Sequence, residues 1–191
     1  MRKTIILIAL ALSVGLTVSN ARADTMLSFG GDYYVGRVLD GIPSSVPDEV
    51  GYINNLKGLG PGAGNTTIGT EIFNREFSTL TGLPTVTAAE LTKYDLDKEA
   101  DYPVSASGYI LGKYDADNPG AGAYVWYVPA GAYVVPGKSP ETWDPEKGMY
   151  RSFGLSHVTY TSTTVPEPGI LILLGIVMSA IGAASWKISK L

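Results

Sequence analysis

Residues 109–128, which read YILGKYDADNPGAGAYVWYV, decide the fold that this sequence predicts. Two runs of aromatic and aliphatic residues, 109–114 and 123–128, have the composition of β-strands. Between them, residues 115–122 are rich in Asp, Asn, Gly and Pro, the residues that form turns. Two strand-like runs joined by a turn-rich loop predict an antiparallel β-hairpin.

Shorter strand-like runs lie on both sides of this hairpin. They comprise residues 26–29 and 33–35, which glycines separate, an alternating run at 67–73, and two further runs at 132–135 and 152–160. Six or seven short strands without a secure helical pattern predict an all-β fold. The expected architecture is an antiparallel β-sandwich-like single domain.

The segments between these runs are predicted to be mostly loops. Residues 41–51 contain Pro43, Pro47 and two serines, and residues 58–64 form a glycine-rich connector. No Lys-Ser/Thr pair follows that connector, so we interpret it as a turn and not as a phosphate-binding loop. Residues 87–90, Thr-Ala-Ala-Glu, match a capping box. Few apolar residues follow, so the box predicts no more than one or two helical turns.

The first 23 residues have the three parts of a secretory signal peptide. The parts are a positive start with Arg2 and Lys3, an apolar centre at residues 4–18, and an A-x-A cleavage site, Ala21-Arg22-Ala23, before Asp24. An uncleaved transmembrane helix is the alternative for this segment. Cleavage would make Asp24 the mature N-terminus and leave residues 24–164 as one secreted domain.

The last 27 residues combine a proline-rich motif, an apolar run and a basic tail. The motif reads Val165-Pro166-Glu167-Pro168-Gly169. The next 17 residues, 170–186, carry no charge and end in Trp186, before Lys187 and Lys190. As a helix they would measure about 25 Å, close to the thickness of a bilayer core of about 30 Å. By itself, the run fits a membrane span, a plain single-pass anchor, or a buried C-terminal helix.

The order of these three parts resembles the PEP-CTERM sorting signal of exported bacterial proteins. The resemblance covers residues 165–191, and softer similarities are the Ser156-His157 step and the Lys-Tyr-Asp and Val-Trp-Tyr pattern of the hairpin. In that family an exosortase, a membrane enzyme, recognises the signal and cleaves near the Pro-Glu-Pro. This tail differs in having two lysines where family tails are often richer in arginine. The resemblance implies a Gram-negative-type bacterium with an exosortase and, commonly, an exopolysaccharide matrix.

The charge of the secreted domain excludes some classes of partner. Residues 24–164 contain nine Lys and Arg against seventeen Asp and Glu, a net charge of −8. Such a surface repels phosphate backbones, so we expect no nucleic-acid partner. The chain has no cysteine, so it forms no disulfide and offers no thiolate chemistry.

One acidic loop is a candidate calcium site. Asp115, Asp117 and Asn118 supply hard oxygen ligands at close spacing, as Ca²⁺ requires. Solvated turn residues are the alternative, and neither this loop nor the acidic run at 95–101 fits an EF-hand. We expect no other cofactor.

The sequence predicts a protein that is not an enzyme. His157 is the single histidine, and its neighbour Ser156 is expected on the opposite face of the same strand, so the two form no triad. Carboxylates are numerous, which leaves open the alternative of a secreted carboxylate-dependent glycoside hydrolase. Tyr124 and Trp126 carry flat apolar faces that can stack on sugars, but we interpret Trp126 as core.

The expected function is that of an exported surface or matrix component. Residues 170–186 would hold the chain in the membrane until an exosortase processes it, after which it would reside at the cell surface or in the extracellular matrix of a biofilm. A structural or carbohydrate-interacting role is the main expectation. A simply membrane-anchored surface protein is the other alternative.

Overall fold

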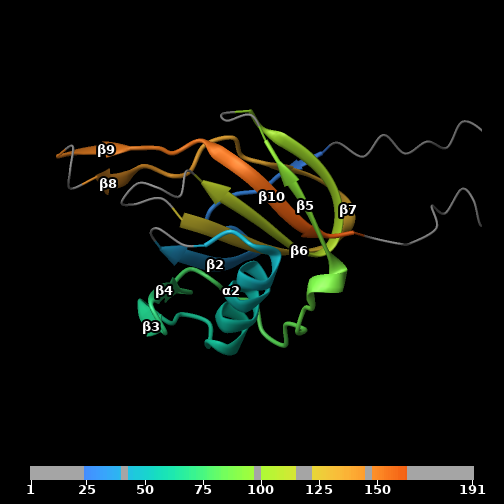
Figure 1. Ribbon diagram of the computed structural model, residues 1–191, viewed down its shortest axis with the longest axis horizontal. Coiled ribbons are helices and arrows are strands. Elements are labelled where there is room, and N and C mark those ends of the chain that lie inside the picture. Colours follow the sequence, from blue (N-terminus) through green and yellow to red (C-terminus); the bar gives the residue numbers. More distant parts are fainter. Residues whose placement is uncertain (1–23, 40–42, 97–99, 115–121, 145–147, 163–191) are drawn as a thin grey trace, which may run out of the picture.

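The computed structural model describes residues 24–39, 43–96, 100–114, 122–144 and 148–162. About half of these residues lie in strands and few lie in helices, which confirms the all-β class (Figure 1). The strands are β1 (Thr25–Met26), β2 (Tyr34–Leu39), β3 (Thr66–Ile68), β4 (Glu71–Asn74), β5 (Leu91–Asp95), β6 (Tyr102–Tyr114), β7 (Gly122–Val135), β8 (Thr142–Asp144), β9 (Met149–Arg151) and β10 (Leu155–Thr161). The helices of this part are α2 (Val46–Gly58) and the 3-10 turn η1 (Ala88–Glu90).

Eight of these ten strands form one sheet. Its order is β3-β4-β2-β7-β6-β10-β5, and every neighbouring pair in that order is antiparallel. β1 pairs in parallel with the far end of β7, and β8 and β9 form a separate hairpin. The β6–β7 hairpin lies at the centre, so the prediction from residues 109–128 is confirmed.

The central hairpin is longer than predicted because a bulge carries it past Pro129. Ala106 pairs with Gly131 and Gly108 with Val128, so the register shifts between these pairs. A bulge tolerates a proline, which cannot donate to a strand ladder. The predicted separate strand at 132–135 is therefore the end of β7.

Beyond this bulge, the sheet bends and packs against itself. A Cβ added to Gly112 would lie 3.1 Å from Val135 Cγ1, and the Tyr114 hydroxyl donates to the carbonyl of Pro136 at 2.8 Å. The end of β7 thus lies over the C-terminal end of β6. The sandwich was predicted from the number of short strands. In the structure, eight of the described strands form one continuous sheet, which folds over itself.

The helix α2 is the main departure from the prediction of loop at 41–51. Ser45 caps it, because its hydroxyl accepts from the Asp48 amide while the Asp48 carboxyl accepts from the Ser45 amide. Pro47 falls in the first turn, where the backbone amides have no intrahelical partner, so it costs the helix nothing. Ile53 and Leu56 bury its inner face against the sheet.

Three other predictions compare with the structure as follows. The run at 67–73 is a tight hairpin of β3 and β4, because Gly69 adopts a positive φ of 66° between them. The capping box at 87–90 is present, and it starts the single turn η1 before β5 begins at Leu91, as its short apolar follow-up predicted. The predicted strand at 152–160 corresponds to β10.

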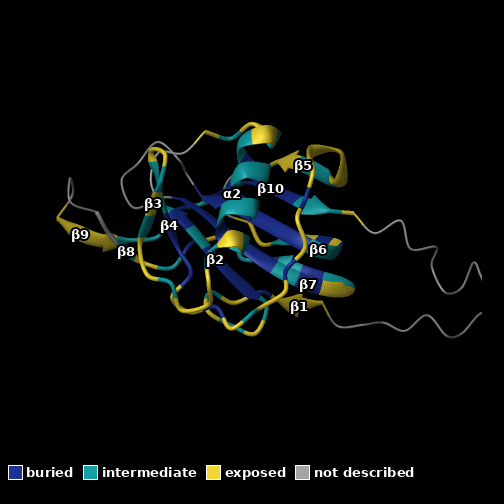
Figure 2. Cartoon of the chain, turned by 90° about the horizontal axis from the view of Figure 1, so that it is seen from below, coloured by how far each residue is buried: buried dark blue, intermediate teal, exposed yellow. Residues whose placement is uncertain are grey.

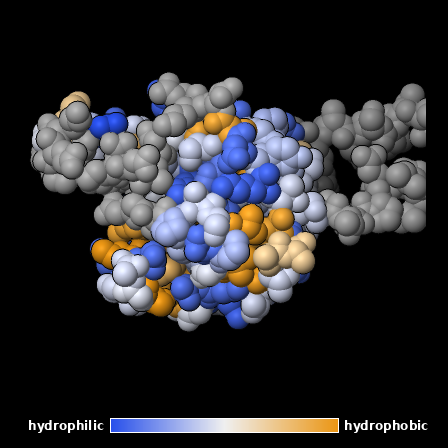
Figure 3. Space-filling model, viewed as in Figure 1, coloured by the Kyte–Doolittle hydropathy of each residue, from blue (hydrophilic) through white to orange (hydrophobic). Residues whose placement is uncertain are grey.

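The sheet buries a hydrophobic cluster on each face. One cluster surrounds Trp126 and includes Tyr114, Leu155 and Val135, while α2 covers the other, around Phe73 and Leu111. Figure 2 shows the buried residues concentrated in the central strands, with exposed ones at the periphery. On the face seen in Figure 3, hydrophobic residues form several separate patches between hydrophilic ones. The domain therefore buries its core between its own elements.

Candidate functional site

A buried polar pair joins α2 to β10. His157 Nε2 lies 2.6 Å from Glu49 Oε1, and the two residues are 4 % and 0 % exposed. Lys93 Nζ lies 4.0 Å from the same carboxylate oxygen and donates to the carbonyl of Ser44 at 2.7 Å. Glu49 Oε2 is buried without a hydrogen-bond partner among the described residues. The pair thus connects elements 108 positions apart in the chain.

Ser156 lies closer to His157 than its position in the strand predicts. The register of β10 shifts between Leu155 and His157, and this bulge brings Ser156 Oγ to 3.5 Å from His157 Nδ1. The expectation of opposite faces is therefore wrong at this bulge, because strand alternation is lost there. The hydroxyl nevertheless donates its proton to the carbonyl of Lys113 at 3.0 Å, so it is not poised to transfer it to the imidazole. The geometry is that of a structural cross-link.

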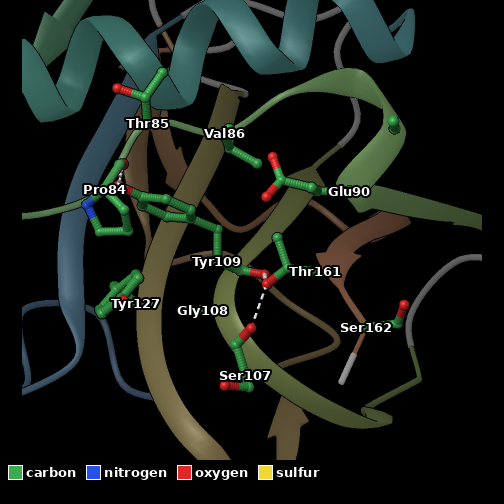
Figure 4. Close-up of a pocket in the computed structure, with 11 residues that line it drawn as sticks. Pro84, Thr85, Val86, Glu90, Ser107, Gly108, Tyr109, Tyr127, Thr161 and Ser162 are labelled. Carbon is green, nitrogen blue, oxygen red and sulfur yellow. Dashed lines mark hydrogen bonds between the residues drawn. The ribbon is translucent and has the colours of Figure 1, made fainter. Parts of the chain in front are cut away.

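A half-open pocket of about 450 Å³ lies on the face of the sheet that carries α2 (Figure 4). Four segments line it: the loop at 84–86, η1, the β6–β7 bend and the end of β10. None of Glu49, Ser156 and His157 lines it. The buried pair and this pocket are separate features of the domain.

The bend of the sheet forms the pocket floor. Gly108 has a φ of +105°, and a Cβ placed there would lie 2.6 Å from Thr161 Oγ1. Thr161 Oγ1 donates to the carbonyl of Ser107 at 2.6 Å, which ties the end of β10 to the bend. Only glycine allows both the backbone conformation and this close approach.

Two tyrosines form the apolar side of the pocket. Tyr109 and Tyr127 meet edge to face, with ring centroids 4.9 Å apart. The Tyr109 hydroxyl donates to the carbonyl of Pro84 at 2.6 Å, and burial raises its pKa to about 12. Tyr109 is buried, whereas Tyr127 is half-buried. Their rings are therefore held in place before any ligand arrives.

Glu90 supplies the charged group of the pocket. Its Oε2 accepts hydrogen bonds from the amide and the hydroxyl of Thr87, at 2.8 and 2.6 Å. These two bonds lower the pKa of the Glu90 carboxyl below its usual value. Figure 4 shows the carboxylate pointing into the same space as Val86 and Thr161. The capping box thus fixes an ionised acceptor at the pocket rim.

The structure tests few of the residues that the sequence singled out. Asp115, Asp117 and Asn118, the sorting motif at 165–169, and Ala21 and Ala23 all lie outside the described residues. Asp24 is the first described residue, and it is exposed. Within the described residues, no group of three or more His, Cys, Asp or Glu could hold a metal ion. Calcium binding by the 115–118 loop therefore stays a prediction.

Trp126 is core, as interpreted from the sequence. Its side chain is fully buried, and its indole N–H donates to the carbonyl of Ser28 at 2.9 Å. Tyr124 is buried in the same cluster, so neither ring is available for stacking on a ligand. Of the aromatic residues in the run at 123–128, Tyr127 is the one that lines the pocket, and the strand pattern alone did not distinguish it from the other two.

Glu49 and Glu90 are the functional candidates that the sequence did not identify. Glu49 lay in a segment predicted to be loop, and nothing local links it to His157. Glu90 was visible as the last residue of the capping box, but its place in the same pocket as Tyr127 depends on the sheet bend. The capping box was thus a local sequence pattern that pointed to Glu90, whereas no local pattern pointed to Glu49.

The chain was compared with family models, with curated proteins and with solved structures. No match was found in any of the three. No helix of the described residues is long and apolar enough to span a membrane, and residues 170–186 lie outside that part. The PEP-CTERM resemblance thus stays a prediction based on residues 165–191.

Proposed function

We propose that this protein is an exported surface or matrix component, delivered through an N-terminal signal and a C-terminal sorting segment. The observation that carries the proposal is that both ends of the described domain lie beside the same bend of β6. Asp24 borders a hollow with Ser105, and Thr161 is bonded to Ser107. Figure 1 shows β1 and the end of β10 on one side of the domain, while the β8–β9 hairpin lies on the other.

This placement suits a domain that faces the membrane with one end, first through the signal peptide and, after its cleavage, through the apolar run at 170–186. The seven residues 163–169 separate Ser162 from the apolar run at 170–186. Fully extended, they span at most about 25 Å, so the bend would face the membrane before processing. The exosortase would then act on Val165-Pro166-Glu167-Pro168-Gly169 in the gap between domain and bilayer.

A non-enzymatic role is favoured over the alternative of a glycoside hydrolase. That reaction needs two carboxyl groups flanking the scissile bond, at roughly 5–10 Å from each other. Among the described residues that line the pocket, Glu90 is the single carboxylate. The other well-placed acid, Glu49, is fully buried against His157. A binding or structural component of an exopolysaccharide matrix fits these features.

The proposal is tested in an exosortase-bearing host with Glu167→Ala. Wild-type protein should be exported with Asp24 as its N-terminus and should lose residues 170–191, as measured by intact mass. Glu167→Ala should accumulate as a longer, membrane-retained form. The matched control Glu141→Ala removes an exposed carboxylate from the folded domain and should be processed normally.

Two results would contradict the proposal. Release of Glu167→Ala at the wild-type mass would show that the motif is not read. Retention of the C-terminal span by the wild type would favour a simple membrane anchor.

A further inference from the structure

The pocket beside the β6–β7 bend combines a fixed anion with an apolar wall. Glu90 Oε2 is held by Thr87, which leaves Oε1 without a partner among the described residues. Pro84, Val86 and the two tyrosines provide the apolar side. A ligand that fits must therefore donate hydrogen bonds at one edge and present an apolar face at another.

The charge of the pocket disfavours anionic ligands. The described residues that line it include no Lys, Arg or His. Glu90 would repel a phosphate, a carboxylate or a uronic acid, and the net charge of −8 over residues 24–164 adds to that repulsion. The remaining polar groups that line it are neutral hydroxyls, those of Thr85, Ser107 and Ser162 among them. Lys57 is not a lining residue, and its ammonium already donates to the Thr85 hydroxyl at 3.0 Å.

A neutral sugar ring has the complementary chemistry. Its hydroxyls donate charge-assisted hydrogen bonds to a carboxylate. Its C–H face packs on an aromatic ring, as Tyr127 offers. The volume of about 450 Å³ falls within the range of roughly 300–1,000 Å³ typical of small-molecule sites.

We propose that this pocket binds a neutral sugar unit of an extracellular polysaccharide, with Glu90 as the hydrogen-bond acceptor and Tyr127 as the stacking surface. The inference rests on the proposed role at the cell surface and assigns a ligand class to this pocket. Its walls include Thr161 and Ser162, the last described residues before the sorting segment. A bound glycan would therefore lie at the membrane-proximal end of the domain.

The test uses the full chain in a zwitterionic detergent without a sugar head group. Neutral trisaccharides, cellotriose and laminaritriose, are titrated by calorimetry beside a triuronic acid. We expect saturable binding of at least one neutral trisaccharide and none of the triuronic acid. Binding of the triuronic acid alone, or of neither class by folded protein, would overturn the proposal.

Three variants assign the binding to the pocket. Glu90→Gln keeps the capping box, because Gln also occupies this position in such boxes, but it removes the charge. It should weaken binding about tenfold, since hydrogen bonds to charged groups are roughly twice as strong as neutral ones. Tyr127→Ala should remove detectable binding. The control Glu76→Gln makes the same charge change at an exposed turn outside the pocket and should bind as the wild type does.

A thermal melt of each variant shows whether it is folded, and binding is compared only among folded proteins. Affinity unchanged in Glu90→Gln would refute the role of the pocket, even if Tyr127→Ala does not fold. Amine-bearing ligands bound in preference to neutral trisaccharides would also overturn the assignment. Normal processing at the sorting motif without glycan binding would reject this inference and leave the proposed export intact.

Discussion

Removing His157 should destabilise the domain more than removing any exposed ionic partner. The imidazole is the nearest partner of the Glu49 carboxyl group, at 2.6 Å, and both side chains are buried. In His157→Ala, the carboxyl group would stay in the interior between α2 and the sheet. Lys93 remains at 4.0 Å, but it already donates to the carbonyl of Ser44.

The expected loss of stability follows from the burial of this pair. Breaking a buried pair by removing one partner costs about 3–5 kcal/mol, because the other is left uncompensated. That is a large part of the roughly 5–15 kcal/mol by which a domain is stable. For a body of this length, it corresponds to a melting temperature lower by roughly 10–15 °C. Glu49→Gln should cost less, because the amide still forms a hydrogen bond with the imidazole.

The measurement is urea unfolding of the secreted body, followed by the fluorescence of the buried Trp126. A double-mutant cycle of Glu49→Ala and His157→Ala should give a coupling energy above about 1 kcal/mol. Asp95→Asn is the matched control, because Asp95 also pairs with Lys93, at 3.7 Å, but is largely exposed. It should change stability by no more than about 1 kcal/mol. A loss below about 1 kcal/mol in His157→Ala would refute the structural role of the pair.

Three further predictions concern the bend, the buried phenol and the acidic loop. Gly108→Ala should destabilise the domain by about 1–3 kcal/mol in urea unfolding, because its φ is +105° and the new Cβ would press on Thr161; wild-type stability would show that the bend is not strained. Burial raises the pKa of the Tyr109 phenol to about 12, whereas in the unfolded state the phenol ionises near pH 10. Between about pH 10 and 12 the folded state therefore keeps a proton that the unfolded state has lost. The contribution of Tyr109 to stability should fall over this pH range. Comparing pH-dependent unfolding of Tyr109→Phe with wild type isolates this contribution, and parallel curves would contradict it. If Asp115 and Asp117 bind Ca²⁺, EDTA should lower the melting temperature, whereas an unchanged melt with EDTA and with added calcium would leave them as turn residues.

Local patterns in the sequence determined the centre of the fold and the expected destination of the chain. Residues 109–128 specify a hairpin because strand-forming residues and turn-forming residues are adjacent there, and β6 and β7 pair as that pattern predicts. The motif at 165–169, the apolar run and the basic tail are likewise contiguous, so they predict sorting without knowledge of the domain. The capping box at 87–90 was also visible locally and is present.

Only the tertiary structure decided where the candidate sites lie. A proline in the first turn is compatible with a loop and with a helix, and packing of Ile53 and Leu56 on the sheet selects the helix. Glu49 and His157 are 108 positions apart, so no sequence window contains both. The pocket depends on a bulge that turns the sheet over itself and places Glu90 and Tyr127 in the lining of one pocket. Such long-range contacts arise from the packing of the whole chain, which neither composition nor spacing records.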